Sequence, residues 1–158
     1  MARSRDLSGV VPEAPYGLVA QRVVEARTEQ LFEEARDVLD LGDIERVHDM
    51  RVATRRLRAA LEIFRPCFPR SRYKAALRDV KALADALGER RDRDVTIEVL
   101  ERLASELDAG DRNGVAALIT DLRGAQERAN ESLAPHVSVV RMEELRGRLR
   151  ALAAAARS

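Results

Sequence analysis

Residues 47–58 constrain the fold of this chain more than any other segment, because the run is two-sided when it is drawn as a helix. It places one histidine and four arginines within eleven residues. At about 100° per residue, an arc of roughly 80° holds His48, Arg51, Arg55 and Arg58. The opposite side holds the apolar residues Met50, Ala53, Leu57, Leu61 and Phe64. The run therefore predicts a helix with one core face and one cationic face.

The rest of the chain has the composition of a helical protein. Leu and Ala with many Glu and Arg favour helices, and with only 3% aromatic residues the core must consist mostly of Leu, Val and Ala. Neither strand alternation nor a two-residue hairpin signal occurs. Gly42, Gly88 and several prolines separate the helical segments. We expect an all-α, antiparallel helical bundle of about six helices, over residues 18–39, 44–64, 71–87, 92–107, 112–133 and 139–156.

The segments outside this bundle are short. Residues 1–15 are polar and contain Gly9, Pro12 and Pro15, so we expect a flexible N-terminal tail followed by a single helical domain over residues 16–158. No apolar run reaches the length of a signal peptide or of a membrane span. The single cysteine, Cys67, excludes an internal disulfide framework. These features predict a cytoplasmic protein with no membrane partner.

Positive charge is concentrated in the middle of the chain. The net charge is only +1. Residues 44–93 nevertheless contain 14 Lys and Arg against 7 Asp and Glu, a local balance of +7, whereas the remainder carries −6. Such asymmetry attracts an anion to one region without making the whole protein bind anions.

A second basic stripe lies on the next expected helix. Lys74, Arg78 and Lys81 share an arc of roughly 40°. Two neighbouring basic stripes can form a trough, and the planar fork of arginine suits phosphate because it binds two oxygens at once. The alternative is a solvated charged face, but the stripe of His48, Arg51, Arg55 and Arg58 lacks the acids that usually alternate with basic residues at i,i+4 spacing.

The segment Arg91-Asp92-Arg93-Asp94-Val95 has two interpretations. Asp92 or Asp94 can cap a helix that begins here. Alternatively, Arg91 lines the basic trough while an aspartate orients the neighbouring arginines. We favour the cap for the aspartates and leave both interpretations open for Arg91.

Catalytic and metal chemistry have little support in the sequence. His48 is accompanied only by His136, and no cysteine cluster exists, so we expect no metal site and no cofactor. No Ser-His-Asp or Cys-His set, glycine-rich phosphate loop or HExxH motif suggests an enzyme. Nucleic acid is an unfavoured partner, because the aromatic platforms that stack on single strands are absent.

Three blocks of the sequence resemble the CHAD domain, the conserved histidine α-helical domain. His48-x-x-Arg51-Val52-x-x-Arg55-Arg56-x-Arg58 is similar to its signature. A second block runs from Lys81 through Leu87-Gly88 to Arg91-Asp92-x-Asp94-Val95, and a weaker closing block is Ser138-x-x-Arg141. The order and spacing agree over about residues 18–154.

This resemblance implies binding of inorganic polyphosphate along a basic surface. Some family members associate with polyphosphate granules, so it also implies a granule location. It assigns the ligand role to His48, Arg51, Arg55, Arg56, Arg58, Lys81 and Arg91. Helical geometry adds Lys74 and Arg78. Arg56 lies about 100° from Arg55, at the edge of the trough or facing a neighbouring subunit.

This chain departs from the family in one respect. CHAD domains usually contain two helical halves in one chain, whereas here one signature and one half are present. We expect a homodimer that rebuilds the full domain. The alternative is a longer parent chain of which this is the first half. Other functions left open are a helical scaffold that docks an acidic protein partner and an accessory subunit of a phosphate-processing enzyme.

Overall fold

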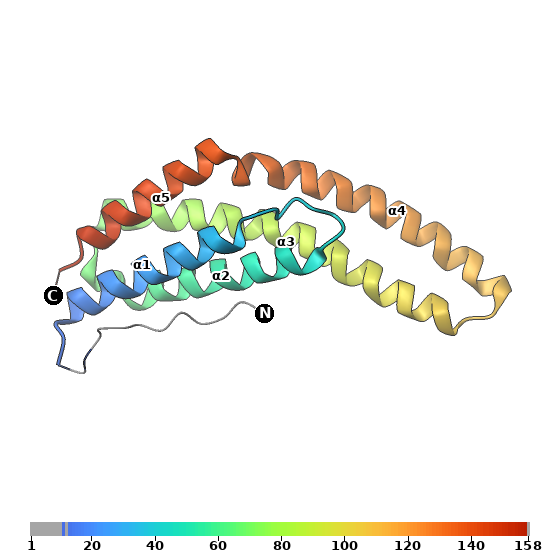
Figure 1. Cartoon of the computed structure of the whole chain (residues 1–158), viewed down its shortest axis with the longest axis horizontal. Coiled ribbons are helices and arrows are strands. Elements are labelled where there is room, and N and C mark those ends of the chain that lie inside the picture. Colours follow the sequence, from blue (N-terminus) through green and yellow to red (C-terminus); the bar gives the residue numbers. More distant parts are fainter. Residues whose placement is uncertain (1–10, 12, 158) are drawn as a thin grey trace.

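Across the residues that the structure describes, the chain forms five α-helices and two short 3₁₀ turns (Figure 1). This computed structural model describes residue 11 and residues 13–157, and the described part contains no strand. The expectation of an all-α fold is therefore confirmed. In chain order the elements are α1 (Tyr16–Glu34), α2 (Ile44–Ile63), η1 (Arg65–Cys67), α3 (Arg70–Glu106), α4 (Ala109–Leu133), η2 (Ala134–Val137) and α5 (Val139–Ala154).

Four helices form the bundle, and a helical hairpin extends from it. Both α2 and α5 pack against α1 and against the first half of α3, so α2 and α5 lie diagonally across the bundle. The second half of α3 and most of α4 form the hairpin, which Figure 1 shows projecting away from the other helices. Antiparallel neighbours with short connections are what a bundle of this kind requires.

Aliphatic side chains from the four bundle helices fill the core. Leu31 of α1, Leu57 of α2, Leu87 of α3 and Leu149 of α5 are all fully buried. Packing of this apolar stripe stabilises the helices more than their intrinsic propensity does. The hairpin has no comparable core, because the three buried residues of α4 lie in its last eight positions: Gln126, Ala129 and Leu133.

The predicted number of helices was wrong because two expected helices are one. We expected a break at Gly88 between residues 71–87 and 92–107, but α3 runs without interruption through this segment. A glycine inside a helix costs only about 1 kcal/mol, and no proline is present to remove a backbone hydrogen bond. Burial of Leu87, Arg90 and Asp94 on either side of Gly88 holds the helix together.

Three smaller expectations at helix ends also need correction. α1 ends at Glu34 rather than near residue 39, and Asp37 in the following turn has a positive φ of 53°. Asp43 occupies the position before α2, but its side chain makes no capping hydrogen bond. Asp92 and Asp94 cap nothing, because both lie inside α3.

The two ends of the described chain differ: the C-terminal end is the bundle helix α5, whereas little of the N-terminal tail is described. The hydroxyl oxygen of Ser138 accepts a hydrogen bond from the backbone N–H of Arg141 and caps α5. Most of the expected N-terminal tail, residues 1–10 and 12, lies outside the described residues. Across residue 11 and residues 13–157, no helix is both long and apolar enough to cross a membrane.

Candidate anion-binding site

Helix α2 places its arginines outside the bundle because its apolar face is fixed in the core. Met50 and Leu57 are fully buried, and Ala53 is almost so. With this face held, Arg51 and Arg55 are exposed to solvent, and Arg58 is partly exposed. The two-sided helix predicted from the sequence is confirmed in its burial pattern.

A groove runs between α2 and α3 beside these arginines. We name it the α2–α3 groove, and it encloses about 420 Å³. One wall consists of Arg51, Arg55 and Arg58 from α2. The other wall comes from α3 and consists of Ala84, Asp85, Gly88, Glu89 and Asp92. The groove is thus cationic on the α2 side and acidic on the α3 side.

Within the part of the chain that the structure describes, no ion pair joins the two walls of the groove. Among the described residues, Arg51 and Arg55 have no carboxylate within 4.0 Å, and neither do they bond to any other side chain. The third arginine, Arg58, pairs only along its own helix, with Nε 3.6 Å from an oxygen of Glu62. Unpaired arginines on one wall leave their hydrogen-bond donors available to an anion.

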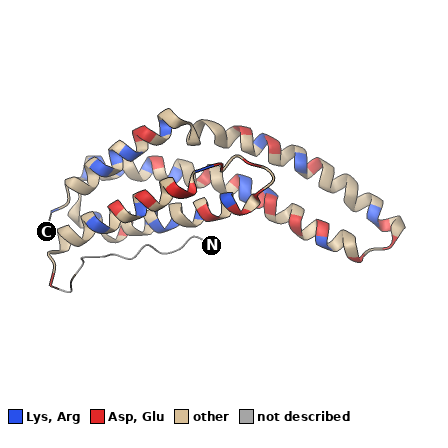
Figure 2. Cartoon of the chain, in the orientation of Figure 1, with Lys and Arg blue, Asp and Glu red and all other residues tan. Residues whose placement is uncertain are grey.

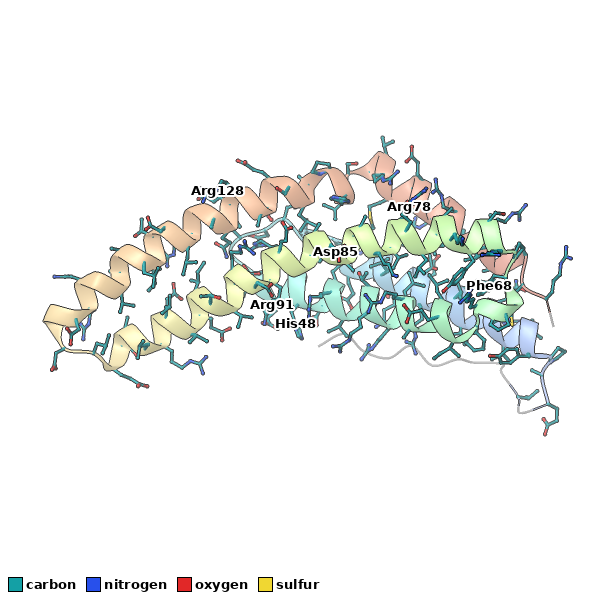
Figure 3. The ribbon with its side chains drawn as sticks, turned by 180° about the vertical axis from the view of Figure 1, so that it is seen from behind. His48, Phe68, Arg78, Asp85, Arg91 and Arg128 are labelled. Atoms are coloured by element: carbon teal, nitrogen blue, oxygen red, sulfur yellow. The ribbon has the colours of Figure 1, made fainter. Side chains whose placement is uncertain are left out.

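A second hollow continues the groove toward the start of α2. It measures about 470 Å³, shares Arg51 and Asp92 with the groove, and adds His48 and Arg91. Figure 3 shows His48 and Arg91 close together, from α2 and α3 respectively. The structure therefore brings together the histidine and the arginine that the sequence placed 43 residues apart.

Arg91 has a structural role in addition to lining the second hollow. Its side chain is only 14% exposed. Nη1 donates to the carbonyl oxygen of Ile44 over 3.4 Å and lies 3.5 Å from Oε1 of Glu45. Arg91 thus ties α3 to the first turn of α2 while it lines the second hollow.

The basic stripe of α3 does not form the facing wall of the groove. Lys74, Arg78 and Lys81 line a separate hollow of about 450 Å³. That hollow meets the groove only at Asp85, which lines both. Figure 3 shows Arg78 and Asp85 at different heights along α3. The expected trough with two cationic walls is therefore not what the helices build.

Arg56 does not line the α2–α3 groove or either of the two neighbouring hollows. Its charge acts on Glu34 of α1, and the pKa of Glu34 is raised by burial and by the nearby Asp49 despite the opposing effect of Arg56. The expectation that Arg56 reaches the edge of the basic surface or faces a neighbouring subunit stays a prediction.

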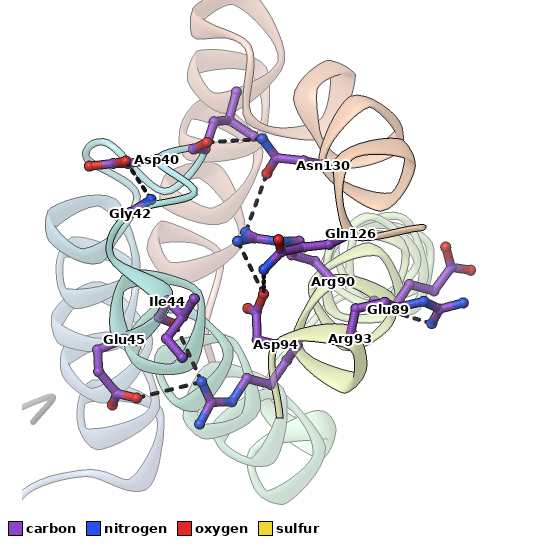
Figure 4. A network of polar contacts seen from close by, with 12 residues as sticks. Asp40, Gly42, Ile44, Glu45, Glu89, Arg90, Arg93, Asp94, Gln126 and Asn130 are labelled. Atoms are coloured by element: carbon purple, nitrogen blue, oxygen red, sulfur yellow. Dashed lines mark hydrogen bonds and ion pairs between the residues drawn. The ribbon is translucent and has the colours of Figure 1, made fainter. Parts of the chain in front are cut away.

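Sequence reasoning missed a buried polar network beneath the site (Figure 4). Nη2 of Arg90 lies 3.1 Å from Oδ1 of Asp94, and neither side chain is exposed to solvent. Gln126 donates to the same oxygen over 2.6 Å, and Arg90 donates to Asn130 over 3.3 Å. The amide nitrogen of Asn130 donates to the carbonyl oxygen of Leu39. This network joins α3 to α4 and to the turn after α1.

Burial dominates the electrostatics of this network. Burial raises the pKa of Asp94, while the hydrogen bond from Gln126 and the charge of Arg90 act in the opposite direction. Burial also lowers the pKa of Arg90, and the charge of Asp94 opposes that shift. A signal for the pair was present in the sequence, because Arg90 and Asp94 interrupt the apolar stripe of Leu83, Leu87 and Ile97.

The arginines of α5 differ from those of α2 because each has a carboxylate partner. The pairs involve Asp79 on α3, Glu29 on α1, and two glutamates on α5 itself. They are Arg141 with Asp79 and Glu144, Arg146 with Glu143, Arg148 with Asp79, and Arg150 with Glu29. Figure 2 shows basic residues along both α2 and α5, so their number does not distinguish the two helices.

The fold and the site define a class: an all-helical bundle domain with a cationic groove wall on one helix. The family model of the CHAD domain matches residues 22–158. The chain therefore belongs to the CHAD domain family. None of the curated proteins matches it. Within the described residues, no group of three or more His, Cys, Asp or Glu side chains is arranged to hold a metal ion.

Proposed function

We propose that this protein binds inorganic polyphosphate along the cationic wall of the α2–α3 groove. Arg51 and Arg55 carry the proposal, because they line the groove and have no carboxylate within 4.0 Å among the described residues. His48 and Arg91 extend the path at one end. Beyond Asp85, Lys74, Arg78 and Lys81 extend it at the other. Membership of the CHAD family supports this ligand.

The chemistry of arginine explains why a phosphate chain is the ligand of choice. Each guanidinium can donate two parallel hydrogen bonds to phosphate oxygens. In a helix, residues 51, 55 and 58 recur along one face over about 10 Å, so successive phosphates of one extended chain can contact successive arginines. We infer a binding module and expect no release of phosphate, with or without a divalent metal.

The first test is a calorimetric titration with polyphosphate of defined length, compared with duplex DNA and pyrophosphate at two salt concentrations. We expect polyphosphate to bind more tightly than either competitor and its affinity to fall as salt rises, because bound counterions are released. Equal affinity for DNA and polyphosphate at physiological salt would contradict the proposal.

The second test removes the cationic wall. Arg51→Ala, Arg55→Ala and Arg58→Ala together should weaken polyphosphate binding by about 100-fold or more, because charge-assisted hydrogen bonds are worth about 1.5–3 kcal/mol each. Circular dichroism should remain helical, because these side chains lie outside the core. The matched control is Arg141→Ala, Arg146→Ala and Arg150→Ala on α5, which removes the same charge from paired residues. A control that binds as weakly as the α2 variant would disprove the site assignment.

We also propose that two copies of the chain associate to complete the binding surface. A symmetric dimer doubles the number of cationic walls, and each wall here faces an acidic one. Static light scattering of the protein at micromolar concentration and moderate salt should give twice the chain mass. A monomer under these conditions would refute the dimer without touching the assignment of Arg51 and Arg55. The expected location is the cytoplasm, at polyphosphate granules.

A further inference from the structure

A separate pocket lies where α2 gives way to α3, at the end of the bundle remote from His48. It encloses about 380 Å³. Its apolar side is formed by Pro66, Phe68 and Tyr73. Phe68 and Tyr73 are only 7% and 8% exposed, so both are fixed in the core. The backbone N–H of Arg157 donates to the carbonyl oxygen of Cys67 and holds the adjoining turn in place.

The rest of this pocket is cationic. Arg65, Arg70 and Lys74 complete its lining, and no carboxylate contributes to it. None of the three has an ion pair within 4.0 Å among the described residues. The guanidinium carbon of Arg65 lies 5.9 Å from the centroid of the Tyr73 ring, a cation–π contact that anchors it beside the apolar side.

This pocket differs chemically from the α2–α3 groove. The groove opposes its three arginines with Asp85, Glu89 and Asp92, whereas the pocket combines three cations with an apolar side. An inorganic anion would satisfy the cations but leave the apolar side uncovered. A ligand with both an anionic group and an apolar or aromatic body would satisfy both, and a pocket of about 300–1,000 Å³ is typical of small-molecule sites.

We propose that this pocket binds an organic phosphate, such as a nucleotide. Its phosphates would contact Arg65, Arg70 and Lys74. Its planar base would lie over the exposed ring of Pro66 and the small exposed parts of Phe68 and Tyr73. This function goes beyond the binding of polyphosphate, because neither Arg65 nor Arg70 lines the α2–α3 groove. Only Lys74 is shared with the hollow that contains Lys81.

The test compares ATP with tripolyphosphate, an anion of similar charge that lacks the base. Calorimetric titrations are made without divalent metal at one ionic strength, on the full chain carrying Arg51→Ala and Arg55→Ala, so that the α2–α3 groove does not contribute to the comparison. We expect ATP to bind about tenfold more tightly, since stacking of a base is worth about 1–3 kcal/mol. Arg65→Ala with Arg70→Ala should reduce ATP affinity at least about tenfold.

Two control variants keep this experiment interpretable. Arg72 lies in the same turn of α3 and is exposed, but it does not line the pocket. The variant Arg72→Ala should therefore retain ATP binding. Arg51→Ala with Arg55→Ala should also retain it while losing polyphosphate. Circular dichroism and the unfolding midpoint establish that every variant is folded.

The proposal is overturned by any of three results. These are equal affinity for ATP and tripolyphosphate, an equal loss of ATP affinity in Arg72→Ala, and no binding of ATP by the parent protein. The outcome does not depend on Arg51 and Arg55, the residues that carry the proposed polyphosphate site, because neither lines the pocket. A parent that binds ATP but not polyphosphate would refute the groove and support the pocket.

Discussion

Helices α2 and α5 lie diagonally across the same bundle and are both rich in arginine, yet their arginines differ in their partners. On α5, all four arginines from Arg141 to Arg150 have carboxylate partners within 4.0 Å. On α2, Arg51 and Arg55 have none among the described residues and line a groove instead. Arginine content alone therefore does not single out a candidate anion site. What distinguishes α2 is that two of its arginines line a groove and have no carboxylate partner among the described residues.

The largest effect is expected where an arginine is paired and fully buried. Asp94→Asn keeps the shape of the side chain and an oxygen that can accept from Gln126, but it leaves the charge of Arg90 uncompensated. Breaking a buried pair in this way costs about 3–5 kcal/mol, measured as the free energy of unfolding in urea.

The control for Asp94→Asn is Glu101→Gln on the same hairpin. Glu101 pairs with Arg123 over 2.6 Å, but both side chains are about half exposed. The loss should stay below about 1 kcal/mol. Similar losses in the two variants would show that burial does not determine the strength of pairing in this protein.

A smaller effect is expected from releasing the paired arginines of α5. Asp79 is only 9% exposed and lies 2.7 Å from Arg148 and 3.6 Å from Arg141. Asp79→Asn removes this shared carboxylate and leaves Arg148 without a carboxylate partner, while Arg141 keeps Glu144. Polyphosphate affinity should therefore rise about fivefold, or about 1 kcal/mol. Titration calorimetry measures the change.

The control in this case is Glu144→Gln, which removes an exposed partner of Arg141 alone and should change the affinity less than Asp79→Asn does. If Asp79→Asn leaves polyphosphate affinity unchanged, pairing is not what distinguishes the two helices.

The smallest effect is expected at the acidic wall of the α2–α3 groove. Asp85→Asn with Glu89→Gln should strengthen polyphosphate binding about threefold at low salt, because the two carboxylates repel the anion across the groove. The gain should shrink at high salt, where exposed charges are screened. Glu127→Gln with Glu131→Gln on α4 makes the same charge change at exposed positions outside the groove. An equal gain in that control would mean that only net charge matters.

Residues within one helix were predictable from the sequence, and contacts between helices were not. The two faces of α2 follow from a period of 3.6 residues, so Arg51 and Arg55 were found without the structure. Asp85 and Glu89 lie opposite these arginines because of the rotation of α3 about its own axis relative to α2. That rotation is set by packing of side chains from several helices, which no local pattern records.

Two further misses have specific physical causes. A glycine such as Gly88 looks the same in a sequence whether it ends a helix or lies inside one. Here the helix continues because residues on both sides of Gly88 are buried. Pairing of Arg141 and Arg148 with Asp79 joins residues more than sixty positions apart. The sequence therefore reveals that α5 is basic but not that its charge is neutralised.

The continuity of α3 has a mechanical consequence. Its 37 residues make a rod of about 55 Å. One half carries the acidic wall of the groove and the other half carries one arm of the hairpin. The buried pair of Arg90 and Asp94 lies along this rod beside the acidic wall, and the hydrogen bond from Gln126 to Asp94 fastens it to α4. The acidic wall and the hairpin arm are therefore parts of one helix, and their orientations are set together.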